Sequence, residues 1–136
     1  MSRSKSNKGF SLIEAVVVVV IVGILATAAF VKYMFVFEKA RADIAKQALW
    51  EIKVAWGQYI LNFRDQSVTF SDLNLDRKEF PHNCAQDNHF FRYDINSTHA
   101  IATRCTSGGK KPQGNQAYTV TLNLENSTWG GTPGYY

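Results

Sequence analysis

The sequence predicts an α+β fold in which a long N-terminal α-helix packs on a small antiparallel β-sheet. Helical periodicity runs through the first half of the chain, and no proline occurs before Pro81. Short β-rich stretches separated by turn residues fill the second half. The chain has 136 residues, of which 46% are hydrophobic and 19% charged, so it suits one compact domain and excludes a disordered or collagen-like protein.

An apolar segment occupies the first part of the expected helix. Residues 15–31 carry no charged side chain. As a helix, residues 10–31 would be about 33 Å long at 1.5 Å per residue, enough to cross a hydrocarbon core of about 30 Å. Arg3, Lys5 and Lys8 precede this segment without an acidic residue, so the positive-inside rule places the N-terminus in the cytoplasm.

The second part of the helix is amphipathic. Its apolar residues recur at steps of one, three and four positions and define one face, which we expect to pack on the sheet: Ile44, Ala45, Ala48, Leu49, Ile52, Ala55, Trp56, Tyr59, Ile60 and Phe63. We therefore expect one helix from about Phe10 to Arg64, roughly 80 Å long if continuous. Such a helix can embed in a membrane at one end and pack on a domain at the other.

The region after Asp65 predicts three strands. The β-rich stretches are residues 89–95, 99–104 and 118–124, joined by an Asn-Ser turn and by a glycine-rich loop. Residues 70–76 suggest a loop with one helical turn, and residues 130–136 show no periodicity. The apolar face of the sheet is expected to cover the helix.

Three interpretations compete for residues 1–37. A secretory signal would be cut after Ala28, within an A-x-A-like string. A plain transmembrane anchor would stay whole, and in the third interpretation the apolar segment begins the mature protein. Glu14 favours the third, because a secretory signal has no reason to carry a carboxylate there. A carboxylate at membrane depth costs roughly 2.5–3.5 kcal/mol and usually serves a function.

The string from Lys8 to Glu14, Lys-Gly-Phe-Ser-Leu-Ile-Glu, is followed by an uninterrupted apolar run. It resembles the class III signal of type IV pilins and type II secretion pseudopilins. The resemblance implies that residues 1–9 are a leader peptide. A prepilin peptidase would cut between Gly9 and Phe10 and N-methylate Phe10.

The resemblance also implies a division of the mature chain within a type IV pilin-like fold. Residues 10–37 would form the hydrophobic transmembrane and filament-core helix. Residues 38–136 would form the globular head. Within the head, the amphipathic half of the helix would occupy residues 38–64, and a loop and antiparallel sheet residues 65–136.

Glu14 has an assembly role in the family that this signal resembles. The resemblance implies that its carboxylate pairs in the filament with the amine of Phe10 on a neighbouring subunit, which makes a buried charge tolerable. Gly23 is the expected point of helix flexibility. The family commonly has a proline where this chain has Val31, so a proline kink is not expected.

The implied partners are a prepilin peptidase/methyltransferase, an inner-membrane assembly platform and other copies of the chain in a homopolymer. The protein would be a single-pass inner-membrane protein before assembly and part of an extracellular pilus filament afterwards. Adhesion, twitching motility or DNA uptake would be its use. A type II secretion pseudopilin is the alternative within the family, and a secreted soluble binding protein cleaved after Ala28 is the alternative from another class.

Cys84 and Cys105 are expected to form a disulfide outside the inner membrane. Closing a loop of this size is worth roughly 3 kcal/mol in the chain-entropy model, which suits a small exported head. Two free thiols are the alternative. A cluster of these cysteines with His82, His89 and His99 has no known metal-ligand spacing, so we expect no metal site.

A basic patch for DNA could be drawn from Lys110 and Lys111 with Arg92 and Arg104, although a solvated loop is the favoured interpretation. The pI near 9.1 is poor support, because most of the net charge of +4 comes from the first nine residues. Aromatic residues on the helix are interpreted as packing groups, within the subunit for the later ones and between subunits for the earlier ones: Phe30, Tyr33, Phe35, Phe37, Trp50, Trp56, Tyr59 and Phe63.

No catalytic residues are predicted. The chain has no G-x-S-x-G, no H-E-x-x-H and no phosphate-binding loop. Glu125 is the only acidic side chain in residues 122–136, so no calcium loop is expected there. We therefore expect a structural protein without a cofactor, and not an enzyme.

Overall fold

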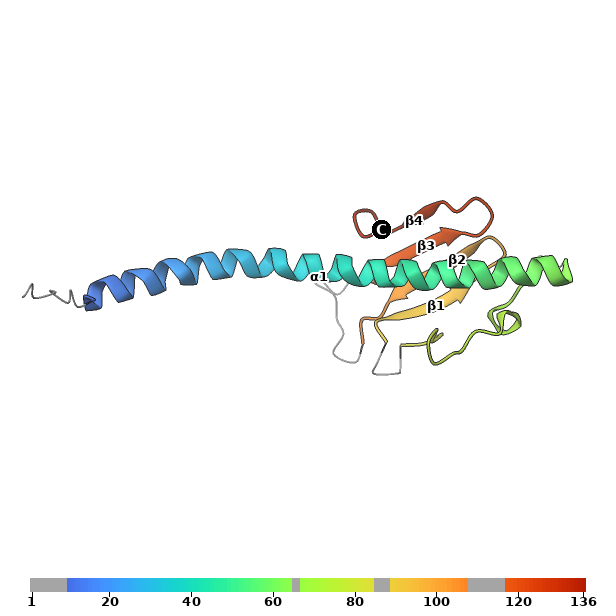
Figure 1. Cartoon of the computed structure of the whole chain (residues 1–136), viewed down its shortest axis with the longest axis horizontal. Coiled ribbons are helices and arrows are strands. Elements are labelled where there is room, and N and C mark those ends of the chain that lie inside the picture. The colour runs from blue at the N-terminus through green and yellow to red at the C-terminus, as the bar shows by residue number, and fades with distance from the viewer. Residues whose placement is uncertain (1–9, 65–66, 85–88, 108–116) are drawn as a thin grey trace, which may run out of the picture. The chain divides into compact units, whose positions relative to one another are not determined.

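The computed structural model describes residues 10–64, 67–84, 89–107 and 117–136. Along the chain they form α1 (Leu12–Phe63), the short 3₁₀ helix η1 (Phe70–Leu73), β1 (Phe91–Ile95), β2 (His99–Arg104), β3 (Thr119–Asn123) and β4 (Trp129–Gly131) (Figure 1). The structure divides into two units, Met1–Met34 and Phe35–Tyr136. The single long helix, the helical turn after it and the three predicted strands are confirmed.

The first unit contains the apolar part of α1. Every side chain described between Phe10 and Met34 is exposed. Among the described residues, α1 is the one helix that is long and apolar enough to cross a membrane. Gly23 lies within this segment, and no atom comes within 4 Å of the place a Cβ would take there.

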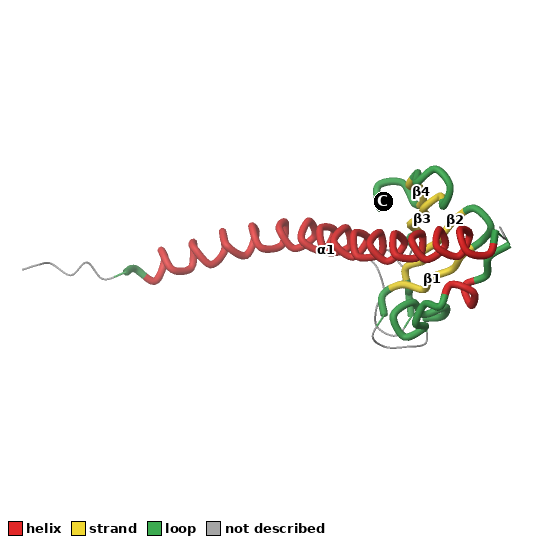
Figure 2. Tube along the Cα trace, turned by 45° about the vertical axis from the view of Figure 1, so that its right-hand side comes forward, coloured by secondary structure: helices red, strands yellow, loops and turns green. Residues whose placement is uncertain are grey.

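The second unit, which we call the head, contains an antiparallel sheet with the strand order β1-β2-β3-β4. The register places Tyr93 opposite Ala102, and Ala102 opposite Val120. The head part of α1 crosses one face of this sheet, and η1 lies on the β1 side (Figures 1 and 2). Each strand thus follows its sequence neighbour in space, as a meander of short connections requires.

The core of the head lies between α1 and the sheet. Burial alternates along β2 and β3, so one face of each strand is turned toward α1. The residues that are 0% exposed come from the helix and from these two strands: Ala45, Leu49, Ile52, Ala100, Ala102, Val120 and Leu122. The two alanines of β2 are small, so the central strand leaves room for a close helix.

β4 is a fourth strand that the sequence analysis did not predict. It pairs with β3, with Trp129 opposite Leu122 and Gly131 opposite Val120. Gly131 has a φ of +126°, and a Cβ there would lie 2.2 Å from the carbonyl oxygen of Thr119. Only glycine suits this close approach. A strand of three residues, two of them glycine, is too short to show an alternating pattern.

The buried face of α1 is narrower than the predicted one. Ile44 and Phe63 are 60% and 67% exposed, and Trp50 is 49% exposed instead of packing within the subunit. At 3.6 residues per turn, Ile44 lies to one side of the buried face of the helix. Phe63 is the last residue of α1. Trp56 and Tyr59 pack against the core, as predicted.

Candidate functional site

Glu14 lies in the first turn of α1, where its carboxylate caps the helix. The carbonyl of Ser11 accepts the first helical hydrogen bond, from the N–H of Ala15 at 3.2 Å. The N–H of Ser11 donates to Oε2 of Glu14 at 2.9 Å. A Ser-x-x-Glu sequence is typical of such a helix start, and the exposed N–H groups of the first turn favour a negative charge there.

The surface around Glu14 is apolar. Phe10, Ile13, Val17 and Val18 border the carboxylate in a shallow groove. Phe10 is 74% exposed, and the large apolar side chains from Leu12 to Leu25 are 50–82% exposed. An apolar surface of this extent is unusual on a soluble monomer and suits contact with lipid or with other helices. Gly9, the residue before the expected cleavage point, lies outside the described residues.

A protein-family model described as a prokaryotic N-terminal methylation motif matches residues 4–30. The chain carries a class III signal. This signal is typical of type IV pilins and type II secretion pseudopilins, which are structural proteins and not enzymes. It implies processing by a prepilin peptidase and assembly into pilus-like polymers. No curated protein and no solved structure matches the chain.

The fold agrees with the class III signal. A long N-terminal helix with an apolar stretch, packed on a four-stranded antiparallel sheet, is a pilin-like α+β arrangement. The apolar helix and the signal together are consistent with membrane anchoring before assembly. Pilins and pseudopilins share these features.

The predicted disulfide between Cys84 and Cys105 is present in the pilin-like head. The two Cα atoms are 5.5 Å apart, within the usual range for a disulfide. Cys105 directly follows β2, is 1% exposed and donates its N–H to the carbonyl of Phe90 at 2.9 Å. The bridge therefore ties the segment before β1 to the end of β2. Among the described residues, no three His, Cys, Asp or Glu side chains gather as metal ligands would.

A buried ion pair between Glu38 and Arg104 is the main polar contact of the core. Arg104 is 1% exposed and Glu38 is 6% exposed. The guanidinium donates from Nη2 to Oε1 of Glu38 at 3.0 Å and from Nε to Oε2 at 3.1 Å, a bidentate pair. Nη1 donates to the carbonyls of Cys105 and Phe90 at 2.8 and 3.2 Å. Arg104 thus uses all its guanidinium nitrogens in the core.

Two further groups reach the carboxylate of Glu38. Arg41, one turn later on α1, donates to Oε1. The hydroxyl of Tyr135 donates to Oε2 at 3.3 Å, and its ring stacks on that of Tyr118 with centroids 4.5 Å apart. We call Glu38, Arg41, Arg104 and Tyr135 the Glu38 clasp. It joins α1 to the end of β2 and to the segment after β4.

Contacts within the clasp shift the pKa values of Glu38 and Tyr135 in opposite directions. Burial would raise the pKa of Glu38, but the hydrogen bonds and charges of Arg104 and then Arg41 outweigh burial and hold that pKa below its ordinary value. Burial and the charge of Glu38 raise the pKa of Tyr135. Tyr135 therefore stays a neutral donor while Glu38 stays an anionic acceptor, which is the state that each contact needs.

The structure places Arg104 outside the basic patch, an interpretation that the sequence analysis considered but did not favour. The sequence analysis grouped it with Arg92 in a basic patch, yet its guanidinium is buried against Glu38. Arg92 is exposed on β1, and Lys110 and Lys111 lie outside the described residues. The missed signal was positional, because Arg104 continues the inward-facing alternation of Ala100 and Ala102 along β2.

Proposed function

We propose that this protein is a type IV pilin-like structural subunit that polymerises into a surface pilus filament. The observation that carries the proposal is the class III signal at residues 4–30, on an apolar helix whose described side chains up to Met34 are all exposed. In this proposal a prepilin peptidase cuts between Gly9 and Phe10 and methylates Phe10. The chain waits in the inner membrane with its N-terminus in the cytoplasm until an assembly platform adds it to a homopolymer.

In the proposed filament, Glu14 pairs with the amine of Phe10 on a neighbouring copy. Its cap on Ser11 engages Oε2, which leaves Oε1 for this partner among the described contacts. Surrounded by apolar helices, an unpaired carboxylate would be penalised by several kcal/mol, and the amine removes that penalty. The pair then sets the axial register of one copy on the next, and Gly23 supplies helix flexibility.

The mature N-terminus tests the processing step. Mass spectrometry of protein purified from the producing bacterium should find methylated Phe10 as the first residue. A start at Ala29 would support a secreted soluble protein instead, and an intact Met1 would support a plain anchor. Gly9→Leu should accumulate unprocessed precursor in the inner membrane, because a bulky side chain at the cut prevents close backbone approach.

Glu14→Val tests the assembly step separately. The substitution makes the helix more apolar, so the variant should insert and be processed as the natural chain is. Without the carboxylate the register contact is lost, and we expect processed monomer in the membrane with few or no filaments by electron microscopy. Abundant filaments of normal shape would assign register to apolar packing alone.

A type II secretion pseudopilin is the second candidate, because the class III signal is common to both groups. Two observations favour the pilin, namely the Cys84–Cys105 disulfide and the single acidic side chain, Glu125, in residues 122–136. Deletion of the gene separates the two. Loss of sheared surface filaments with normal protein secretion supports a pilin, whereas loss of secretion supports a pseudopilin.

A further inference from the structure

Two exposed tryptophans lie together on one flank of α1 in the head. Trp50 of α1 is 49% exposed and Trp129 of β4 is 39% exposed, and both border one shallow depression with Lys46. Nζ of Lys53 lies 5.5 Å from the ring centroid of Trp50 and donates to Oγ of Ser127. We call Trp50, Trp129, Lys46 and Lys53 the tryptophan patch. Tryptophan is enriched at protein contact surfaces compared with the rest of the protein surface.

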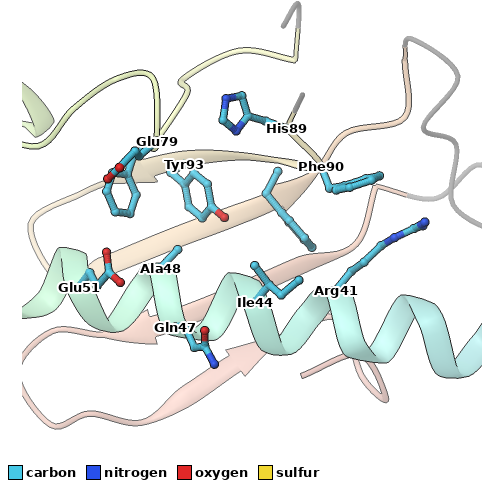
Figure 3. Close-up of a pocket in the computed structure, with 11 residues that line it drawn as sticks. Arg41, Ile44, Gln47, Ala48, Glu51, Glu79, His89, Phe90 and Tyr93 are labelled. Atoms are coloured by element: carbon cyan, nitrogen blue, oxygen red, sulfur yellow. The ribbon is translucent and has the colours of Figure 1, made fainter. Parts of the chain in front are cut away.

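The opposite flank of α1 carries a groove of about 290 Å³ between the helix and β1 (Figure 3). Its apolar lining comes from both sides, with Ile44 and Ala48 on the helix facing β1, the strand that carries Tyr93. Glu51 and Glu79 lie at the same end of the groove. We call this surface the β1 groove.

The two surfaces lie on either side of the solvent-facing side of the same helix, and Gln47 and Glu51 border both of them. At 3.6 residues per turn, Trp50 and Ile44 project to opposite sides of the buried line that contains Ala45 and Leu49. The two surfaces are unlike, because tryptophan rings border one and the other is the groove against β1. When unlike surfaces of identical copies meet, the contact is heterologous and propagates into a ring or a helical polymer. A class III signal implies such a polymer.

The charges of the two surfaces are complementary. Glu51 and Glu79 make no ion pair among the described residues, and neither does Lys53. Arg41 also borders the groove, but its charge is engaged by Glu38. Glu51 borders both surfaces, so the complementary pair is Glu79 of the groove and Lys53 of the tryptophan patch, neither of which has an ion-pair partner among the described residues. Complementary charges of this kind fix the register of a contact more than they strengthen it.

We propose that the tryptophan patch of one copy docks in the β1 groove of the next copy of this chain. Trp50 and Trp129 supply the apolar anchor, and Lys53 meets Glu79 at the rim. This inference rests on the proposed function and adds the head surface through which neighbouring copies recognise each other. It assigns a contact separate from the Glu14 pair, which lies on the apolar segment.

Cross-linking of assembled filaments tests the proposal. Lys46→Cys places a thiol beside the tryptophans, and Glu79→Cys places one at the groove, while the anchor residues stay intact. A chain carrying both should give a ladder of dimers, trimers and larger species when sheared filaments are treated with a short bismaleimide. Each single variant should stay monomeric, because a heterologous contact pairs position 46 with position 79 and not with itself.

The outcomes separate this inference from the proposed function. Natural chains that form no filaments would overturn both. Filaments of the double variant without a ladder would overturn the docking alone, as would a ladder from either single variant. If the double variant is processed but does not polymerise while the natural chain does, the ladder is absent and the specific pairing is withdrawn.

Side-chain removal provides a second, independent test. Trp50→Ala should lower the yield of sheared filament protein by about tenfold or more, since buried tryptophan anchors dominate such contacts. Leu61→Ala is the matched control, because Leu61 is an 82% exposed apolar residue of α1 outside both surfaces. Equal losses from the two variants would overturn the docking. Lys53→Glu should also reduce yield, and adding Glu79→Lys should restore it; no restoration would overturn the rim contact.

Discussion

Arg104 occupies a position where an apolar residue is the default. It follows Ala100 and Ala102 on the inward face of β2, and a guanidinium there is tolerated only with a carboxylate partner. Glu38 supplies that partner from 66 positions earlier in the chain. The carbonyls of Cys105 and Phe90 bind the remaining nitrogen, so no part of the buried cation is left without an acceptor.

Arg104→Met should destabilise the head strongly. The substitution keeps a similar apolar volume but leaves the carboxylate of Glu38 buried with fewer donors, at a cost of about 3–5 kcal/mol. Urea unfolding of the detergent-solubilised chain, followed by tryptophan fluorescence, measures this loss. Glu38→Leu combined with Arg104→Met should recover most of it, because an apolar pair needs no partner. Equal stability of the natural chain and the single variant would refute the importance of the clasp.

The clasp should also make the head sensitive to acid. The pKa of Glu38 in the folded head lies below its ordinary value of 4.5. The contribution of Glu38 is therefore complete above pH 4.5 and is lost as the pH falls through the folded-state pKa. The free energy of unfolding, measured from about pH 7 to about pH 3, should fall more for the natural chain than for the Glu38→Leu, Arg104→Met variant. Parallel curves for the two would contradict this.

At the scale of elements, β4 pairs with β3 through a close backbone contact. Its residue Gly131 packs its Cα against the carbonyl of Thr119, and the segment after it brings Tyr135 back to Glu38. β4 therefore pairs with the edge of β3, and it positions the segment that carries Tyr135 of the clasp.

Gly131→Ala should destabilise the head, since both the positive φ and the contact with Thr119 oppose a Cβ. We expect a loss of about 1–3 kcal/mol in the free energy of unfolding. Gly57→Ala is the matched control, because no atom lies within 4 Å of the new Cβ in α1. That change should stabilise the head by about 0.5–1 kcal/mol. No loss of stability in Gly131→Ala would show that the close contact of β4 with Thr119 does not hold as described.

The disulfide links two other elements, the segment before β1 and the end of β2. Removing it by Cys84→Ala with Cys105→Ala should lower the free energy of unfolding by about 3 kcal/mol, because 21 positions separate the bridged residues. Thiol labelling of the denatured, non-reduced natural chain checks the premise and should find neither cysteine reactive. Unchanged stability in the double variant would mean that other contacts hold these segments, such as the hydrogen bond from the N–H of Tyr93 to the carbonyl of Pro81.

For the whole molecule, sequence reasoning predicted the features that have a strong local sequence pattern. A long apolar run, a 3.6-residue periodicity and three alternating stretches identify α1, β1, β2 and β3, and the string around Glu14 identifies the class III signal. Each of these patterns lies within a few consecutive residues, so no knowledge of distant contacts is needed.

The features that escaped prediction depend on residues far apart in the sequence. β4 is defined by the closeness of Gly131 to Thr119, and the clasp by contacts of Glu38 with Arg104 and Tyr135. Their inward positions carried a signal, because Glu38 precedes Ala42, Ala45 and Leu49 on the buried face of α1. No sequence signal indicated that Trp50 and Ile44 are exposed, because their spacing along the helix is equally compatible with buried positions.

The contact between Glu38 and Tyr135 spans 97 positions of the chain. The head therefore cannot form this contact until Tyr135 has been synthesised. A chain made from its N-terminus delivers Glu38 long before Tyr135. During that interval the carboxylate of Glu38 lacks the hydroxyl donor of Tyr135. A contact of such long range also forms slowly. A chain interrupted before Tyr135 would keep Arg104 but lack this donor. Completion of the clasp therefore marks a chain that has been translated and folded through β4.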